Sequence, residues 1–169
     1  MKAAVVPASI VLLAVLTACG ERRPAVSPFA AAESTAVELE RLRPGLGRTA
    51  YRVVEGDNQS DVAAYTSGPA NVVLVEEMRL LGGFGSVRAG YYLSNGKLVY
   101  YREEGLRGRD TPSGPVVDSI ARRFAFDTAG HIVATEALIN GKAQPIDTAA
   151  VRGVQHHLRT LLDSFPRLP

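Results

Sequence analysis

Most of this chain shows the alternation of apolar and polar residues that is typical of β-strands. The alternating segments are separated by short stretches rich in glycine, proline, asparagine and aspartate, which favour turns. Because short turns join strands that run in opposite directions, we expect an antiparallel meander of about six or seven strands. The segments are 49–55, 62–66, 71–79, 86–93, 98–104, 120–126 and 132–139.

The segment Val72-Val73-Leu74-Val75 is apolar on both faces, which predicts a central strand. Asn95-Gly96 lies between two alternating segments, and this dipeptide is the strongest short signal for a hairpin. The run from Tyr92 to Val99 resembles a MORN-type hairpin, with a weaker second copy at 126–133. That resemblance implies a scaffold or a binding surface, although hairpins of a single meander explain both copies better.

A different spacing begins near the C-terminus. Apolar residues recur there with the period of one helical face, and Asp147 precedes them as a predicted N-cap. They are Val151, Val154, Leu158, Leu161 and Phe165. A short helix is also expected at 36–43, ended by Pro44-Gly45. The predicted fold class is α+β, with the C-terminal amphipathic helix packed on one face of the meander.

The N-terminus has the composition of a secretory signal. Met1-Lys2 precedes an apolar stretch that ends in Leu16-Thr17-Ala18-Cys19. The stretch is shorter than the about 20 apolar residues of a spanning helix, and it contains Pro7.

The tetrapeptide resembles the lipobox of bacterial lipoproteins. The resemblance implies cleavage before Cys19, acyl chains on that residue and attachment to a membrane of the cell envelope. Because Gly20 follows instead of aspartate, it also favours the periplasmic side of the outer membrane in a bacterium that has two membranes.

This reading divides the chain into a signal peptide at 1–18, a lipidated cysteine with a flexible tether at 19–33, and one α+β domain at 34–169. A formal net charge of +2 argues against a nucleic-acid partner, which requires clustered basic residues. Cys19 is the only cysteine, so neither a structural disulfide nor a cysteine zinc site is expected.

The sequence offers no coherent catalytic or metal-binding motif, and we assign no catalytic residue, cofactor or metal. His156 and His157 are adjacent on the predicted helix and point about 100° apart, and His131 lies in a predicted turn. Glu77 and Glu103 are candidate acids, but they would meet only if their strands were adjacent and in register.

Five residues are candidates for a binding surface: Phe84, Tyr92, Tyr100, Arg107 and Arg109. Phe84 lies in a glycine-rich turn, and the two arginines lie in the segment 105–118, which we expect to be an irregular loop. The function favoured by the sequence is a lipid-anchored, non-catalytic binding or accessory module with an envelope protein as partner. The alternatives are a small hydrolase that uses carboxylates or a histidine, and an inhibitor of a wall-degrading enzyme.

Overall fold

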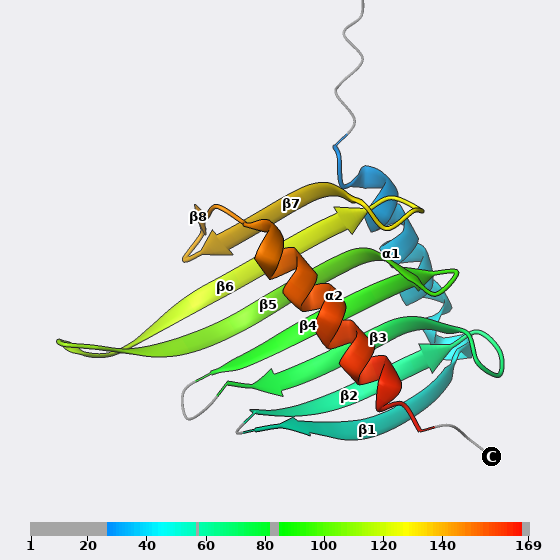
Figure 1. Cartoon of the computed structure of the whole chain (residues 1–169), viewed down its shortest axis with the longest axis horizontal. Helices are drawn as coiled ribbons and strands as arrows, with labels where there is room; N and C mark the ends of the chain where they lie inside the picture. The colour runs from blue at the N-terminus through cyan, green and yellow to red at the C-terminus, as the bar shows by residue number, and fades with distance from the viewer. Residues whose placement is uncertain (1–26, 57, 82–84, 167–169) are drawn as a thin grey trace, which may run out of the picture.

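The computed structural model describes residues 27–56, 58–81 and 85–166. Eight antiparallel strands form one sheet in chain order, so each strand lies beside its neighbours in sequence (Figure 1). The strands are β1 (Gly47–Glu55), β2 (Asn58–Thr66), β3 (Val72–Leu80), β4 (Ser86–Ser94), β5 (Lys97–Thr111), β6 (Gly114–Phe126), β7 (Ile132–Ile139) and β8 (Lys142–Ala143). The α+β meander is confirmed. The expected six or seven strands become eight because a two-residue strand, β8, follows the turn at Asn140-Gly141.

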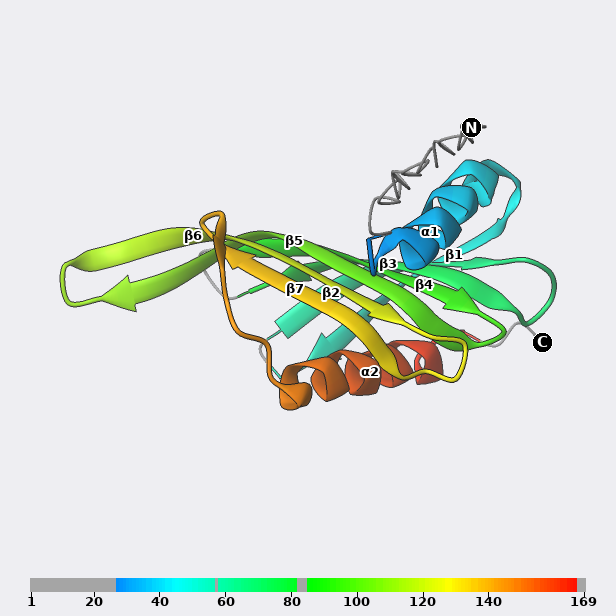
Figure 2. The same cartoon turned by 90° about the horizontal axis from the view of Figure 1, so that it is seen from above.

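Two helices cover opposite faces of this sheet (Figure 2). Helix α2 (Thr148–Asp163) begins where the sequence predicted, because the carboxylate of Asp147 accepts a hydrogen bond of 2.7 Å from the backbone N–H of Ala150. Its predicted apolar face is also confirmed, since Val151, Leu158 and Leu161 are buried against the sheet.

Helix α1 (Ala30–Leu42) starts six residues before the expected 36–43 helix, so that expectation was wrong. Phe29 and Ala32 are buried beneath it together with Ala36. The folded part of the chain therefore includes residues 29–33, which the sequence analysis had assigned to the tether. Alanine has the highest helix propensity, and this alanine-rich start gains further stability by packing on the sheet.

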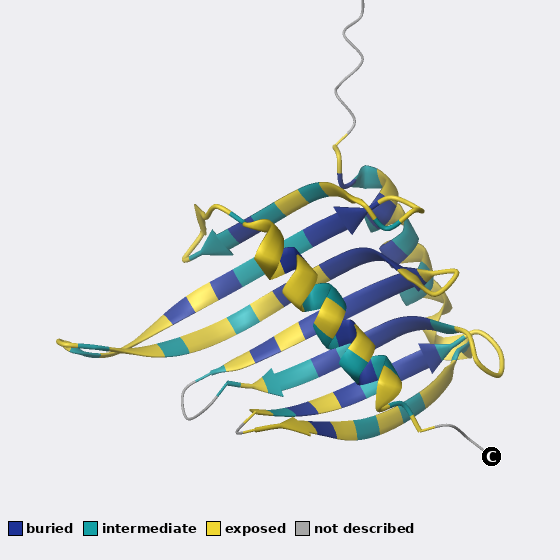
Figure 3. Cartoon of the chain, viewed as in Figure 1, coloured by how far each residue is buried: buried dark blue, intermediate teal, exposed yellow. Residues whose placement is uncertain are grey.

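The core has one layer on each face of the sheet. Consecutive residues of a strand contribute to opposite layers. Tyr91 and Tyr101 lie on the α2 face, whereas Tyr92 and Tyr100 lie on the α1 face. The predicted central strand is confirmed because its Leu74 and Val75 side chains are both fully buried. Figure 3 shows this burial concentrated in the middle strands and lost toward the sheet edges.

The segment 105–118 is not an irregular loop. Strands β5 and β6 continue through it as one hairpin, which projects beyond the rest of the sheet (Figure 1). Its last pair is Thr111 with Gly114, so Pro112-Ser113 forms the turn. The sequence did not predict strands here because the segment contains charged residues and Gly108. A strand without further sheet neighbours is not buried, so it has few of the apolar residues from which a strand is recognised.

Candidate functional site

Charged side chains are buried on the α2 face of the sheet, where α2 crosses β3 to β5. We call Glu77, Arg79, Tyr91, Glu103 and His157 the buried ion cluster. Glu77 on β3 and Glu103 on β5 are both in register with Ala89 of β4, so the two carboxylates share one row across the sheet. The sequence analysis expected the two residues to meet only on adjacent strands, but β3 and β5 are separated by β4. The small alanine between them and a bridging Arg79 bring them into one cluster instead.

Arg79 makes that bridge from the next row of β3. Its Nη2 atom lies 3.0 Å from Oε2 of Glu77 and 4.0 Å from Oε2 of Glu103. Glu103 also accepts a hydrogen bond from the Tyr101 hydroxyl and lies 3.6 Å from Arg122. Both carboxylates are therefore paired with arginine in a region that excludes most solvent.

Glu77 is the most heavily engaged member of the cluster. Its Oε1 accepts hydrogen bonds from the hydroxyl of Ser60 at 2.6 Å and from His157 Nε2 at 2.9 Å. Its Oε2 accepts from Arg79 at 3.0 Å and from the Tyr91 hydroxyl at 2.9 Å. A carboxylate has about four lone-pair positions, so these donors occupy all of them.

These contacts set the ionisation of the cluster. Burial alone would raise the pKa of Glu77, but the hydrogen bonds from His157 and Arg79 and the charge of Arg79 outweigh it and hold the pKa well below its usual range. Burial and the nearby Glu77 charge raise the pKa of Tyr91 well above its ordinary value. Glu77 is therefore a permanent anion with no free lone pair, which suits a structural role and not proton transfer.

The three histidines do not converge. His157 points from α2 into the buried ion cluster, with its Nδ1 3.4 Å from Glu55. His156 is exposed, and His131 lies in the β6–β7 turn beside Asp127, at 3.2 Å. Within the described residues, no group of three or more histidine, aspartate or glutamate side chains is placed to hold a metal ion. The same residues include no helix that is both long enough and apolar enough to span a membrane.

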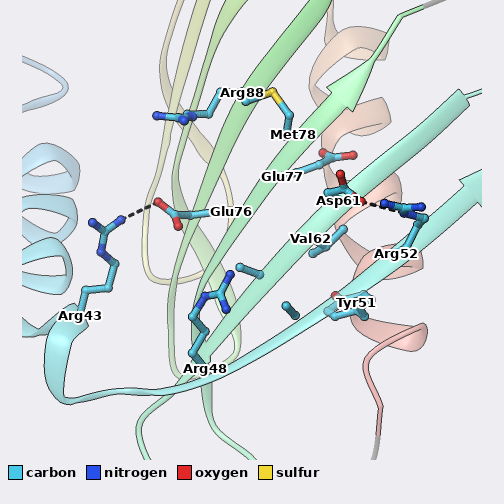
Figure 4. A pocket seen from close by; sticks show the side chains of 12 residues that line it. Arg43, Arg48, Tyr51, Arg52, Asp61, Val62, Glu76, Glu77, Met78 and Arg88 are labelled. Carbon is cyan, nitrogen blue, oxygen red and sulfur yellow. Dashed lines mark hydrogen bonds and ion pairs between the residues drawn. The ribbon is translucent and has the colours of Figure 1, made fainter.

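The α1 face has a different character. A cleft of about 860 Å³ lies beside the C-terminal end of α1, over β1 to β4 (Figure 4). We call it the arginine cleft, because its lining includes Arg43, Arg48, Arg52 and Arg88. The cleft is hollow because Ala50 and Ala63, which are in register with each other and with Glu76, have small side chains.

Only part of the positive charge in the arginine cleft is neutralised. Arg43 lies 2.8 Å from Glu76, and Arg52 lies 2.8 Å from Asp61. Glu76 also accepts a hydrogen bond of 2.7 Å from the Tyr65 hydroxyl. Within residues 27–56, 58–81 and 85–166, neither Arg48 nor Arg88 forms an ion pair, and both are exposed.

The structure separates the residues expected to form a binding surface. Tyr92 and Tyr100 are buried beneath α1, with 0% and 6% of their surface exposed, so these two candidates pack in the core instead of forming a binding surface. The Tyr92 hydroxyl donates to Glu40 of α1 at 2.8 Å, which fixes the helix on the sheet. Phe84, like the lipidation candidate Cys19, lies outside the described residues.

Arg107 and Arg109 are exposed on the projecting hairpin, whose residues 106–119 we call the arm. Strand β4 pairs with β5 only as far as Leu106, and β7 pairs with β6 only from Ile120, so beyond Leu106 the arm strands pair only with each other. At its base, Asp118 binds Arg109 at 2.6 Å and the Asn140 side chain at 2.7 Å. These hydrogen bonds, that of Arg109 first, lower the pKa of Asp118.

Sequence reasoning missed the arginine cleft. A signal was present in β1, where Arg48, Ala50 and Arg52 alternate with Tyr51 and Val53, so a basic face was readable beside an apolar one. The contribution of Arg88 and Glu76 was not readable, because it depends on the register of β3 and β4.

Comparison with known proteins gives no relative for this chain: no family model, no curated protein and no solved structure matches it.

Proposed function

We propose that this protein is a lipid-anchored component of a bacterial cell envelope that binds a protein partner without catalysis. Acyl chains on Cys19 attach it to the membrane, on the periplasmic side of the outer membrane where there are two. The lipobox-like Leu16-Thr17-Ala18-Cys19 supports the anchor. The arm supports the binding role, and it is the observation on which the proposal rests.

The two sides of the arm differ: one is mostly apolar, and the other carries the two arginines. Leu106 and Val117 lie on the same side, because Leu106 is in register with Ser119, two residues from Val117. Their exposed fractions are 51% and 54%, which is high for large apolar side chains. The opposite side bears Arg107 and Arg109, together with Val116, which is in register with Arg109 and 36% exposed.

A projecting hairpin gains little stability from exposing apolar residues, and its outer backbone groups have no sheet neighbour. Such a hairpin is well suited to lie against another protein, with apolar contact on one side and charge-assisted hydrogen bonds on the other. The hydrogen bonds of Asp118 to Arg109 and Asn140 hold its base in one geometry, which lowers the entropy lost on binding.

The hydrolase alternative is less well supported. A general acid needs a raised pKa and a general base needs a free lone pair, whereas Glu77 has a lowered pKa and is fully occupied. The inhibitor alternative is a special case of the proposal, in which the partner of the arm is a wall-degrading enzyme.

Photo-crosslinking in intact cells tests the binding role. A photoreactive residue at Leu106 or Val117 should crosslink one and the same protein, and the matched position Val54, which is exposed on β1, should not. With the photoreactive residue at one of these two arm positions, replacement of the other by serine should remove the crosslinked product. Equal labelling from all three positions, or none from the arm, would contradict the proposal.

The anchor has its own test. Cys19→Ala should move the protein from the membrane fraction to the soluble fraction, and Cys19→Ser, which also lacks the thiol, should do the same. Membrane fractionation that both variants leave unchanged would rule out lipidation at this position, whatever the result of crosslinking.

A further inference from the structure

The arginine cleft has the features of a ligand site on the face opposite the buried ion cluster. Helix α1 covers the row of Tyr65, Leu74, Tyr92 and Tyr100, and it leaves the next row of the sheet open. That row contains Ala50 and Ala63, whose small side chains leave a hollow in the surface beside the helix, whereas Gly90 in the same row is covered by the Tyr92 ring. A second hollow of about 280 Å³ continues it along α1, sharing Arg43, Glu76 and Arg88.

The charges of the cleft indicate an anionic ligand. Its lining holds four arginines and, on the α1 face, the two carboxylates Glu76 and Asp61. Arg43 also pairs with Glu40 of α1 at 3.4 Å, so among the described residues the lining arginines without an ion pair are Arg48 and Arg88. Glu77 also borders the cleft, but its carboxylate is bound to Arg79 on the other face. Arg88 is in register with Glu104 of β5 and, like Arg48 beside the Tyr65 hydroxyl, forms no ion pair within the described residues, so both guanidinium groups can bind a ligand.

The positions of these two groups indicate two separate anionic centres in the ligand. Figure 4 shows Arg48 and Arg88 on opposite sides of Glu76, whose carboxylate points to Arg43. Their strands, β1 and β4, lie about 14 Å apart in the sheet, so two separate anions suit the two guanidinium groups better than one small anion, and an anion at the centre would be repelled by Glu76. A ligand with an uncharged hydroxyl-bearing middle would instead donate hydrogen bonds to Glu76 and place an anion at each arginine. Guanidinium groups bind phosphate through paired hydrogen bonds.

We propose that the arginine cleft binds a molecule that carries two phosphate groups joined by an uncharged polyol. Arg48 and Arg88 each bind one phosphate, and Glu76 selects the polyol between them. Such a ligand exists both as a lipid headgroup and as a soluble sugar bisphosphate. This site is separate from the arm and does not depend on the binding function proposed for it.

Calorimetric titration of the full chain in neutral detergent micelles tests the site. The soluble probe is fructose 1,6-bisphosphate, with fructose 6-phosphate as the matched one-phosphate control. The lipid probe is cardiolipin added to the micelles. We expect one of the two-phosphate probes to bind, and the one-phosphate sugar to bind at least about tenfold more weakly than the bisphosphate if the source is soluble. Binding of cardiolipin alone would identify the source as a lipid headgroup.

Three variants assign the binding to the cleft. Arg48→Gln and Arg88→Gln should each weaken binding by about tenfold or more, whereas Arg159→Gln, the same change on the exposed side of α2, should not. Glu76→Gln should remove the selection for an uncharged centre, so the affinity of the one-phosphate sugar should come closer to that of the bisphosphate. Failure of both two-phosphate probes to bind, or binding that the Arg48 and Arg88 variants leave unchanged, would overturn the proposal.

Discussion

The same kinds of residue have opposite environments on the two faces of this sheet. Glu76 and Glu77 are adjacent in β3, yet Glu77 is buried under α2, whereas Glu76 lies in the open arginine cleft. Both bind an arginine and a tyrosine hydroxyl. The difference lies in solvent access. On the α2 face each charge depends on its partner, because water cannot replace it. On the α1 face water can solvate a charge in place of its partner, so arginines there remain available for a ligand.

Removing one carboxylate from each face gives the largest expected contrast. Glu77→Gln leaves Arg79 and the Tyr91 hydroxyl without their anion, and we expect a loss of about 3 kcal/mol in the free energy of unfolding. This is the lower end for a broken buried pair, because Arg79 keeps 22% of its side chain exposed. Glu76→Gln should cost less than about 1 kcal/mol. Urea denaturation measures both, and equal losses would contradict the contrast between the faces.

The same contrast should appear in the pH dependence of stability. Glu77 has a folded-state pKa below its unfolded value of about 4.3, so it contributes stability above that pH and loses the contribution as the pH falls. Below about pH 5 the unfolded chain takes up a proton that folded Glu77 does not. Unfolding measured between pH 7 and pH 3 should therefore show a shallower acid decline in Glu77→Gln, by up to about 1.4 kcal/mol per pH unit. Parallel curves for the variant and the natural protein would show that Glu77 titrates normally.

The fold was largely readable because its signals are local. Alternation located the strands, Asn95-Gly96 located a hairpin and Asp147 located the start of α2, and each depends on residues close in sequence. The start of α1 was missed because its stability comes from Phe29 packing on distant strands. The arm was missed because its strands carry few apolar residues.

The candidate sites were less readable, since both depend on register. Glu77 and Glu103 share a row only because each is paired with Ala89, and no local pattern reveals that. Strand geometry places Tyr91 and Tyr92 on opposite faces, but it does not tell which face a helix covers. The structure shows that a helix covers each face, so the exposed side chains are the arginines and not the tyrosines.

Two tyrosine hydroxyls provide a smaller and cleaner comparison. Tyr91→Phe removes a fully buried donor from Glu77, and we expect a loss of about 1.5–3 kcal/mol, typical of a hydrogen bond to a charged group. Tyr65→Phe removes the equivalent donor from Glu76, whose side chain is 31% exposed, and water can replace it. We therefore expect a loss nearer 0.5–1.5 kcal/mol there. Thermal or urea unfolding of the two variants measures the difference, and a larger loss for Tyr65→Phe would reverse the assignment of the two faces.

The smallest expected effect concerns the arginines that the cleft leaves unpaired. Arg88→Gln and Arg48→Gln remove exposed charges that make no ion pair in the described residues, so stability should change by less than about 0.5 kcal/mol. Arg79→Gln, the same change on the α2 face, should destabilise the fold about as much as Glu77→Gln. Residues that contribute nothing to folding yet line a hollow of this size remain free to contribute to binding. A large loss of stability in Arg48→Gln or Arg88→Gln would instead make the α1 face a second structural cluster, because its arginines would then be holding the sheet together.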